Sequence, residues 1–213
     1  FTYLLADPTT KEAVLIDPVV ETAERDALLI KELGLKLTVA VNTHCHADHV
    51  TGTGKLKDQK ECKSLRGLSQ AHTADVYYFH GDTIPFGSHF LEVRSTPGHT
   101  DGCITFVQSW SYTKAAPVIS GCGRTDQGGN AGMLYDNVHA QIFSLPDNCV
   151  IFPAHDYKGM TSATVLEEKT SNYRLTKTRE EFITIMDNLN LPYPKQIDRA
   201  LPLNMVCGIQ DAP

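Results

Sequence analysis

The sequence predicts an α/β fold in a single domain that spans residues 1–213. Residues 2–6 and 13–16 are typical of two strands, and residues 21–33 repeat apolar side chains at helical spacing. Residues 37–41 are apolar and uncharged, as in a buried strand. Strands and helices that alternate in this way favour layers of helix on sheet, with functional side chains at the carboxyl ends of the strands.

Turn and cap residues mark the ends of these elements. Residues 7–10 predict a turn between the first two strands, Asp17 and Pro18 end the second strand, and Gly34 ends the helix. Further strands are predicted over residues 76–79, 90–93, 103–107 and 149–152, and further helices over 134–143, 161–169 and 178–188, the last beginning with a capping box of Thr178 and Glu181. Residues 50–75 are expected to be partly helical, and residues 203–208 show no periodicity.

The composition argues against two classes of protein. The net charge of −6 speaks against a dedicated nucleic-acid binder, although a local cation could still hold a small anionic ligand. No apolar run approaches the roughly 20 residues that span a bilayer, and no signal or transit segment is visible. Because residues 1–5 are already strand-like, we expect the chain to begin inside a longer protein, from which a targeting segment could have been removed.

The cysteines predict free thiols rather than a disulfide framework. They are spread along the chain without a Cys-x-x-Cys pair, and a domain of this size can build its core without disulfides. The count alone leaves a single bridge open. We therefore expect a reducing compartment in which the thiols are Cys45, Cys62, Cys103, Cys122, Cys149 and Cys207.

Directly after the strand at 37–41 comes a cluster of potential metal ligands: His44, His46, Asp48 and His49. Two histidines at positions i and i+2 of an extended chain point to the same side, and the Asp-His pair follows where the chain can turn into a helix. Imidazole with carboxylate suits zinc, iron or manganese. The cluster predicts a metal site, and the alternative is a polar strand end with solvated histidines.

Two later strands also lead to a histidine. His99 follows a tight turn that Pro97 and Gly98 impose, and His155 follows the strand at 149–152. A lone histidine after a turn is more often solvated than bound to metal, but the cluster still lacks a closing ligand. Between these two, a loop with glycine on both sides of Cys122 presents Arg124.

Several motifs together resemble a known family. THCHADH is similar to the His-x-His-x-Asp-His signature of the metallo-β-lactamase fold, and TPGHT and PAHDY resemble the later histidine motifs of its glyoxalase II-like branch. With GCGRTD, NLNLPYP and NMVCG, the chain resembles the mitochondrial type of persulfide dioxygenase, also called sulfur dioxygenase. The resemblance implies an αββα sandwich of two mixed sheets flanked by helices, with a short C-terminal helical extension.

The resemblance also implies roles for single residues. One Fe(II) per chain would be bound by His44 and His99, the two catalytic positions, together with an Asp, which leaves three sites for the substrate sulfur and O₂. The remaining cluster residues and His155 would orient ligands and water by hydrogen bonds, or complete a two-metal site as in the hydrolase relatives; these are His46, Asp48, His49 and His155. Arg124 resembles the arginine that holds the substrate carboxylate, with a surface salt bridge as the alternative. Tyr157 and Cys207 resemble positions near the pocket, with a role in packing as the alternative.

The expected third iron ligand is missing. The family carries this Asp in a Phe-Thr-Gly-Asp segment, whose best match here is residues 112–115, with Ala115 in place of the Asp. No Asp or Glu lies between Gln108 and Gly123. The alternatives are an error in the sequence over residues 108–120, a natural inactive relative, or another carboxylate or water at the site. Lys114 and Pro117 disrupt an expected apolar strand, which favours the first.

The resemblance implies that glutathione persulfide, O₂ and water are converted to sulfite and glutathione in hydrogen sulfide detoxification, in the mitochondrial matrix. Neither nucleic acid nor a membrane is expected as a partner, and a homodimer is compatible with the family. One alternative is a glyoxalase II-like glutathione thioester hydrolase, but only 58 residues follow His155, which leaves little room for the helical glutathione-binding domain of those enzymes. A catalytically impaired relative that binds without turnover is the other alternative.

Overall fold

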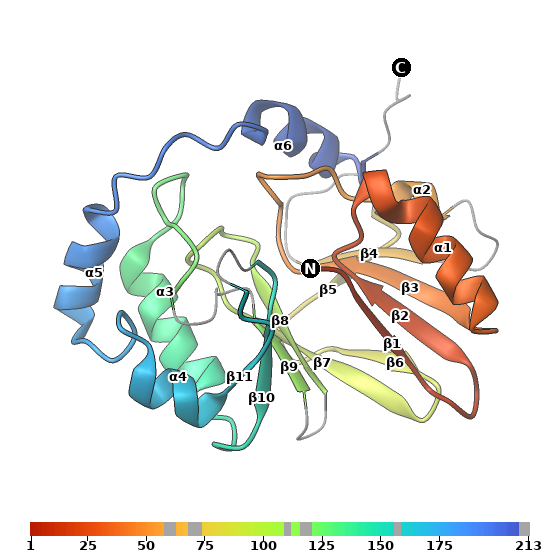
Figure 1. Ribbon diagram of the computed structural model, residues 1–213, viewed down its shortest axis with the longest axis horizontal. Coiled ribbons are helices and arrows are strands. Elements are labelled where there is room, and N and C mark those ends of the chain that lie inside the picture. The colour runs from red at the N-terminus through yellow and green to blue at the C-terminus, as the bar shows by residue number, and fades with distance from the viewer. Residues whose placement is uncertain (58–62, 68–73, 109–111, 116–120, 156–158, 209–213) are drawn as a thin grey trace. The chain divides into compact units, whose positions relative to one another are not determined.

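The computed structural model describes residues 1–57, 63–67, 74–108, 112–115, 121–155 and 159–208 (Figure 1). These residues form two compact units. The N-terminal unit consists of residues 2–78 and 83–90 together with the C-terminal segment from Tyr193, and the central unit consists of Phe1, residues 79–82 and residues 91–192. Each unit carries strands and helices, so the predicted α/β class is confirmed. The single-domain organisation over 1–213 stays a prediction.

The N-terminal unit is built on a five-stranded mixed sheet in the order β1-β2-β3-β4-β5. Its first two strands are antiparallel and the other pairs are parallel, and the strands are β1 (Tyr3–Ala6), β2 (Glu12–Ile16), β3 (Lys36–Asn42), β4 (Lys63–Gly67) and β5 (Val76–Tyr78). The parallel step from β2 to β3 passes through η1 (Val20–Thr22) and α1 (Ala23–Glu32). Gly34 follows α1 with a φ of +63°, a left-handed conformation that glycine adopts without strain.

The core of this unit shows why these segments form strands and helices. Ala23 and Ile30 of α1 pack against Leu15, Leu37 and Ala40 of the sheet, so one apolar face of the helix covers the apolar run that precedes the histidine cluster. Leu56, from the short helix α2 (Thr53–Lys57), completes the cluster. The histidine-bearing segment therefore begins at the end of β3, whose last four residues are all buried.

The second sheet has the strand order β11-β10-β9-β8-β7-β6. The strands are β6 (Thr83–Phe86), β7 (His89–Ser95), β8 (Ile104–Gln108), β9 (Tyr112–Ala115), β10 (Val150–Pro153) and β11 (Ala163–Thr164). β9 and β10 are parallel, and Ala115 at the end of β9 lies opposite Pro153 at the end of β10. The main chain at Ala115 therefore ends a strand next to the strand that leads to His155.

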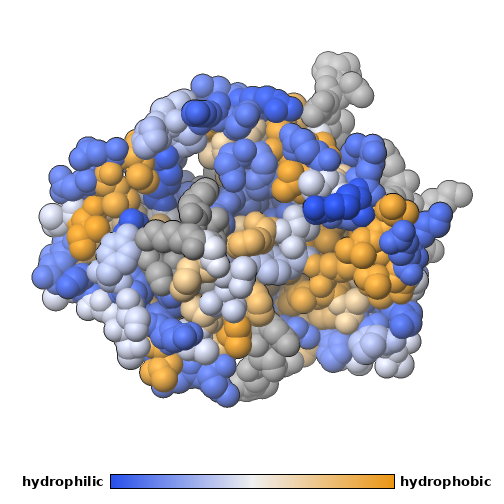
Figure 2. Space-filling model, in the orientation of Figure 1, coloured by the Kyte–Doolittle hydropathy of each residue, from blue (hydrophilic) through white to orange (hydrophobic). Residues whose placement is uncertain are grey.

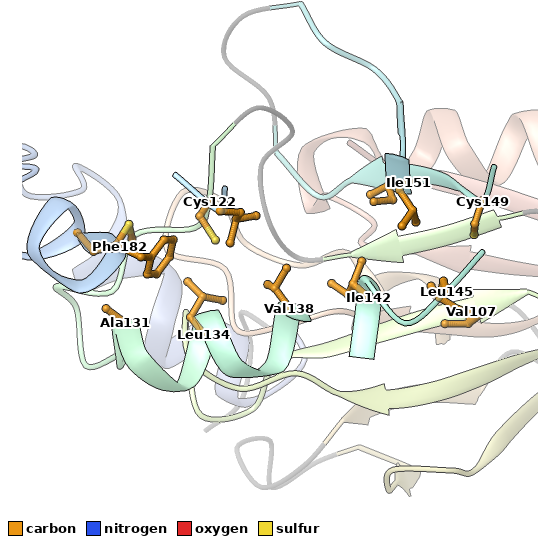
Figure 3. Close-up of a cluster of buried hydrophobic side chains, with 13 residues drawn as sticks. Val107, Cys122, Ala131, Leu134, Val138, Ile142, Leu145, Cys149, Ile151 and Phe182 are labelled. Carbon is orange, nitrogen blue, oxygen red and sulfur yellow. The ribbon is translucent and has the colours of Figure 1, made fainter. Parts of the chain in front are cut away.

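The helices of the central unit pack on this sheet around one apolar cluster (Figure 3). They are α3 (Ala131–Asn137), a π-helical turn η2 (Val138–Ile142), α4 (Val165–Ser171) and α5 (Arg179–Asp187). Leu134, Val138 and Ile142 lie along one side of α3 and η2, in the same buried cluster as Val107 and Ile151 of the strands. The predicted capping box of α5 is confirmed, because the Thr178 side chain accepts from the Glu181 amide while the Glu181 side chain accepts from the Thr178 amide.

The structure differs from the expected elements at several places. Residues 197–205 form α6 (Ile197–Met205), for which no helix was predicted because Pro202 stands inside it and cannot donate to the helix. The predicted helix at 161–169 starts only at Val165, after β11, and the one at 134–143 is divided into α3 and η2. The chain does not turn into a helix at Asp48 and His49, because the next helix begins at Thr53.

The surface mixes hydrophilic and hydrophobic residues, and some of the hydrophobic ones gather near α1 (Figure 2). Leu28, Leu29 and Leu33 are exposed there. Among the described residues, no helix is long and apolar enough to cross a bilayer. Five cysteines in the described part of the chain are buried free thiols, and Cys62 lies outside it.

Candidate metal centre

In the N-terminal unit, the loop that follows β3 gathers three histidine rings. His44 and His46 are 4% and 1% exposed, so both imidazoles are held inside the protein rather than in solvent. The ring centroids of His44 and His46 lie 4.0 Å apart, and those of His46 and His49 lie 4.1 Å apart. Ligand atoms of His46, Asp48 and His49 all lie within 4.8 Å of one another. Buried imidazoles next to a carboxylate are the donor set of a transition-metal site, which fits the predicted cluster.

Asp17 organises this cluster, and sequence reasoning missed it. Its buried carboxylate accepts hydrogen bonds from the Thr43 amide at 2.6 Å and from the Thr43 hydroxyl at 2.9 Å. His46 Nε2 lies 3.2 Å from Asp17 Oδ1, within ion-pair distance when the imidazole is protonated. The φ of Asp17 is +50°, an uncommon conformation for a residue other than glycine. The only signal in the sequence was an Asp before a Pro at the end of a strand.

The Asp17–Thr43 pair also determines the protonation of His44. The single hydroxyl proton of Thr43 is given to Asp17, so Thr43 Oγ1 can only accept from His44 Nδ1, which lies 3.0 Å away. The proton of a neutral His44 is therefore on Nδ1, and the lone pair is on Nε2. This is the state in which an imidazole binds a metal through Nε2 while its other nitrogen is held by a hydrogen bond.

Asp48 and His49 are arranged differently from the two buried histidines. His49 Nδ1 lies 3.1 Å from Asp48 Oδ1, and 46% of the Asp48 side chain is exposed. His46 Nδ1 is 4.0 Å from the same carboxylate oxygen. Asp48 is thus the more open, solvent-facing member of the cluster.

In the central unit, His99 is held in the same way as His44. Its Nδ1 lies 2.5 Å from the main-chain oxygen of Arg124, and a carbonyl oxygen can only accept, so the proton is on Nδ1 and the lone pair on Nε2. The turn before His99 is fixed from α3 and its cap: the Asn130 amide donates to the Gly98 oxygen, and the Asn137 side chain donates to the Pro97 oxygen.

Two glycines let the main chain approach His99 closely. A Cβ on Gly98 would lie 2.4 Å from Leu134 Cα, and the φ of Gly98 is +139°. A Cβ on Gly123 would lie 2.9 Å from the His99 ring. The glycines of the PGH and GCGR motifs are therefore required by packing around His99.

In the GCGRTD loop, the Arg124 side chain is held by hydrogen bonds to Asp126 and Pro192. The guanidinium donates to both carboxylate oxygens of Asp126, at 2.6 and 2.5 Å, and to the Pro192 oxygen at 2.9 Å. These contacts fix the plane of a side chain that is 19% exposed. In the same loop, burial raises the pKa of the Cys122 thiol to about 12, so this cysteine stays protonated and is no nucleophile.

The Arg124–Asp126 pair predicts an acid-dependent loss of stability. The hydrogen bond from Arg124 is the main cause that lowers the pKa of Asp126 to about 2. A lowered pKa in the folded state adds stability that is fully present above the ordinary carboxyl pKa and is lost as the pH falls toward 2. In urea unfolding, the stability difference between the wild type and Asp126→Asn is expected to shrink from pH 6 to pH 3, and a pH-independent difference would contradict it. Because Asp126 is largely exposed, the effect is small.

The remaining predicted site residues are distributed as follows. His155 is half-buried and follows β10 in the central unit, close in sequence to Pro153, which pairs with Ala115. Cys207 belongs to the N-terminal unit, where it is 4% exposed and follows α6. Tyr157 lies outside the described residues.

Comparison with known proteins identifies close relatives. The model of the metallo-beta-lactamase superfamily matches residues 1–74. The protein named "Persulfide dioxygenase ETHE1, mitochondrial" of Mus musculus is 59% identical over 100% of this chain and 86% of its own length. A hydroxyacylglutathione hydrolase of Thermosynechococcus vestitus is 32% identical, over 78% of this chain and 68% of its own length.

A solved structure agrees with these sequence matches. The crystal structure of ETHE1 from Myxococcus xanthus superposes with a TM-score of 0.94 at 45% identity and covers 98% of this chain and 94% of that one. The metallo-β-lactamase fold predicted from the histidine motifs is therefore confirmed.

Proposed function

This chain belongs to the persulfide dioxygenase family of oxidoreductases, and we propose that it oxidises the terminal sulfur of glutathione persulfide with O₂ at a single Fe(II). The expected products are sulfite and glutathione, with one water consumed for each O₂. Because the mammalian relatives are named as mitochondrial proteins, we also propose the mitochondrial matrix as its location. A homodimer stays a prediction from the family resemblance.

The observation that supports an iron site is that His44 and His99 are hydrogen-bonded in the same way. Each histidine has its Nδ1 hydrogen-bonded to an oxygen, which leaves the Nε2 lone pair as the donor for a metal. Two neutral imidazoles fit two of the three ligands of a two-His-one-carboxylate iron site. The third position does not fit, because Ala115 offers no donor.

The residues around the iron ligands have separate tasks in this proposal. Fe(II), when bound, supplies the redox chemistry that lets O₂ react with a persulfide sulfur. Asp17 and Thr43 hold His44 by hydrogen bonds, and the Arg124 oxygen holds His99, so both imidazoles are positioned before substrate arrives. His46, Asp48, His49 and His155 are proposed to hydrogen-bond ligands and water without binding iron. Tyr157 and Cys207 are proposed to lie near the substrate.

Arg124 is proposed to hold a carboxylate of the substrate through its guanidinium. Arg124→Ala is expected to lower kcat/KM by roughly tenfold to a hundredfold, since one charge-assisted hydrogen bond is worth about 1.5–3 kcal/mol. Steady-state O₂ uptake with glutathione persulfide measures this, in the iron-loaded chain that carries Ala115→Asp.

Asp126→Asn is the matched control for Arg124. It removes the partner carboxylate but keeps the guanidinium, whose contact with Pro192 remains. If Arg124 only stabilises the loop through Asp126, Arg124→Ala and Asp126→Asn lower kcat/KM equally, and the proposed contact of Arg124 with the substrate is wrong. A loss confined to Arg124→Ala supports it, provided that both variants unfold at similar urea concentrations.

The hydrolase alternative is less well supported. The hydroxyacylglutathione hydrolase relative is 32% identical, against 59% for the persulfide dioxygenase relative. The proposed function is tested by turnover of glutathione persulfide with and without O₂ in the iron-loaded chain that carries Ala115→Asp: sulfite is expected only when O₂ is present. Hydrolysis of a glutathione thioester without O₂ uptake would contradict the proposal and favour the hydrolase.

A further inference from the structure

α6 carries a polar side chain on its buried face. Ile197, Ala200 and Asn204 are the buried residues of this helix, and their spacing places them on one side. Asn204 is 0% exposed. A fully buried amide is unfavourable unless its donors and acceptor are hydrogen-bonded, so the partners of Asn204 reveal why an amide is present at a core position.

The Asn204 side chain bonds to the main chain of the histidine segment. Nδ2 donates to the oxygens of His46 and His49, at 2.8 and 2.9 Å. Oδ1 accepts from the Thr51 amide at 2.7 Å. A carbonyl oxygen can only accept and an amide can only donate, so these partners also fix which way the side-chain amide points. Asn204 therefore bridges both sides of the turn that contains Asp48 and His49.

The residues after α6 contact the same segment. The Cys207 oxygen accepts from the Gly54 amide at 2.8 Å and from the Thr53 hydroxyl at 3.3 Å. Gly208 has a φ of +76°, and a Cβ there would lie 2.0 Å from the Thr51 oxygen. The NMVCG motif thus lies directly on the chain that follows the histidines, although about 150 residues separate the two in sequence.

We propose that Asn204 is a positioning residue for the metal-binding segment: its amide fixes the main chain from His46 to Thr51 and so sets the geometry of the histidine cluster. This inference rests on the proposed metal function. The bonds go to the main chain that follows the proposed iron ligand His44 and that carries His46, Asp48 and His49, which are proposed to orient ligands and water. Loss of Asn204 therefore releases these side chains as well as α6. Residues that orient the surroundings of a metal typically change metal affinity by about 10–100-fold.

Asp7 offers a matched control in the same unit. It is 1% exposed and accepts hydrogen bonds from the Ser88 amide and hydroxyl, both at 2.7 Å, and from the Thr9 amide at 2.7 Å. Asp7 follows Ala6, the last residue of β1, which pairs with Ala13 of β2. Ala13 in turn pairs with Leu37, near the start of β3, whereas the histidines follow the end of β3. Asp7→Ala removes a buried carboxylate and its hydrogen bonds but does not alter the contacts of residues 46–51.

The experiment compares Asn204→Ala and Asp7→Ala in the full chain that carries Ala115→Asp. Titration with Co(II), a spectroscopic probe for the iron site, gives the dissociation constant and the visible spectrum of the bound metal. Asn204→Ala is expected to raise the dissociation constant by about 10–100-fold and to change the spectrum, whereas Asp7→Ala leaves both within about twofold of the reference. Should Asn204→Ala fail to fold, Asn204→Asp gives the same comparison, because it keeps an acceptor for Thr51 but loses both donors.

Amide hydrogen exchange in the metal-free chain that keeps Ala115 gives a second readout. The Thr51 amide is expected to exchange faster in Asn204→Ala and unchanged in Asp7→Ala. Equal shifts of Co(II) affinity in the two variants, or a destabilised Asn204→Ala with unchanged affinity, would overturn the proposal. If the Ala115→Asp chain without further substitution binds no Co(II), the proposed metal function has failed. In that case an unchanged exchange rate of the Thr51 amide in Asn204→Ala would overturn the positioning role as well.

Discussion

Ala115→Asp is expected to convert a chain that holds iron weakly into one that binds one Fe(II) firmly. The main chain places residue 115 at the end of β9, opposite Pro153 at the end of β10, so a carboxylate there would stand at a strand end, where ligands are found in this class of fold. It would add a negative charge and a hard oxygen to two neutral imidazoles. We expect the gain in iron affinity to exceed the roughly 10–100-fold that an outer partner contributes.

The measurement is iron content after anaerobic loading, together with O₂ uptake on glutathione persulfide, for the natural chain and Ala115→Asp in parallel. Iron and activity in Ala115→Asp alone would show that the alanine is a sequence error or the lesion of an inactive relative. Equal and substantial iron in both would show that another group closes the site, and the match of Ala115 to the family Asp would be wrong. Lys114→Asp is a control, because it also places a carboxylate on β9 but one residue earlier, and it removes the positive charge of Lys114 as well.

Replacing either proposed iron ligand is expected to remove both the iron and the activity. In the Ala115→Asp chain, His44→Gln and His99→Gln each delete one imidazole whose Nδ1 is already held by an oxygen. His49→Gln and His155→Gln are expected to keep one iron per chain, because these residues are proposed not to bind it. Elemental analysis after loading measures the iron, and circular dichroism checks that each variant is folded.

The comparison between these variants also shows whether the chain binds one metal ion or two. A two-metal site would lose metal in His49→Gln and His155→Gln as well, and the reference chain would hold two ions at full occupancy. Either result would contradict the single-iron account and would favour the hydrolase chemistry.

The parts of the fold that depend on local pattern could be predicted from the sequence. The apolar run of β3 and the helical spacing of α1 were visible because each buries its own regular face against the other. The histidines that follow β3 were visible because four metal-binding side chains within six residues are typical of a metal site.

Features that depend on contacts between distant residues could not be predicted. Asp17 looked like a strand end, and its role follows only from its bonds to Thr43, 26 residues away. Asn204 lies in a helix that was not predicted because it contains Pro202, and the hydrogen-bond partners of Asn204 are more than 150 residues earlier in the sequence. For Arg124 the sequence suggested a substrate contact, with a surface salt bridge as the alternative, and the structure shows such a salt bridge with Asp126. The bond to the Pro192 oxygen, 68 residues away, could not be predicted.

The most direct test of the central claim, one iron bound through His44 and His99, is anomalous diffraction at the iron edge from crystals of the iron-loaded Ala115→Asp chain. The account predicts one anomalous peak per chain, within bonding distance of Nε2 of His44 and Nε2 of His99. A second peak of similar height, or a single peak bonded to His46, His49 or His155 instead, would contradict it.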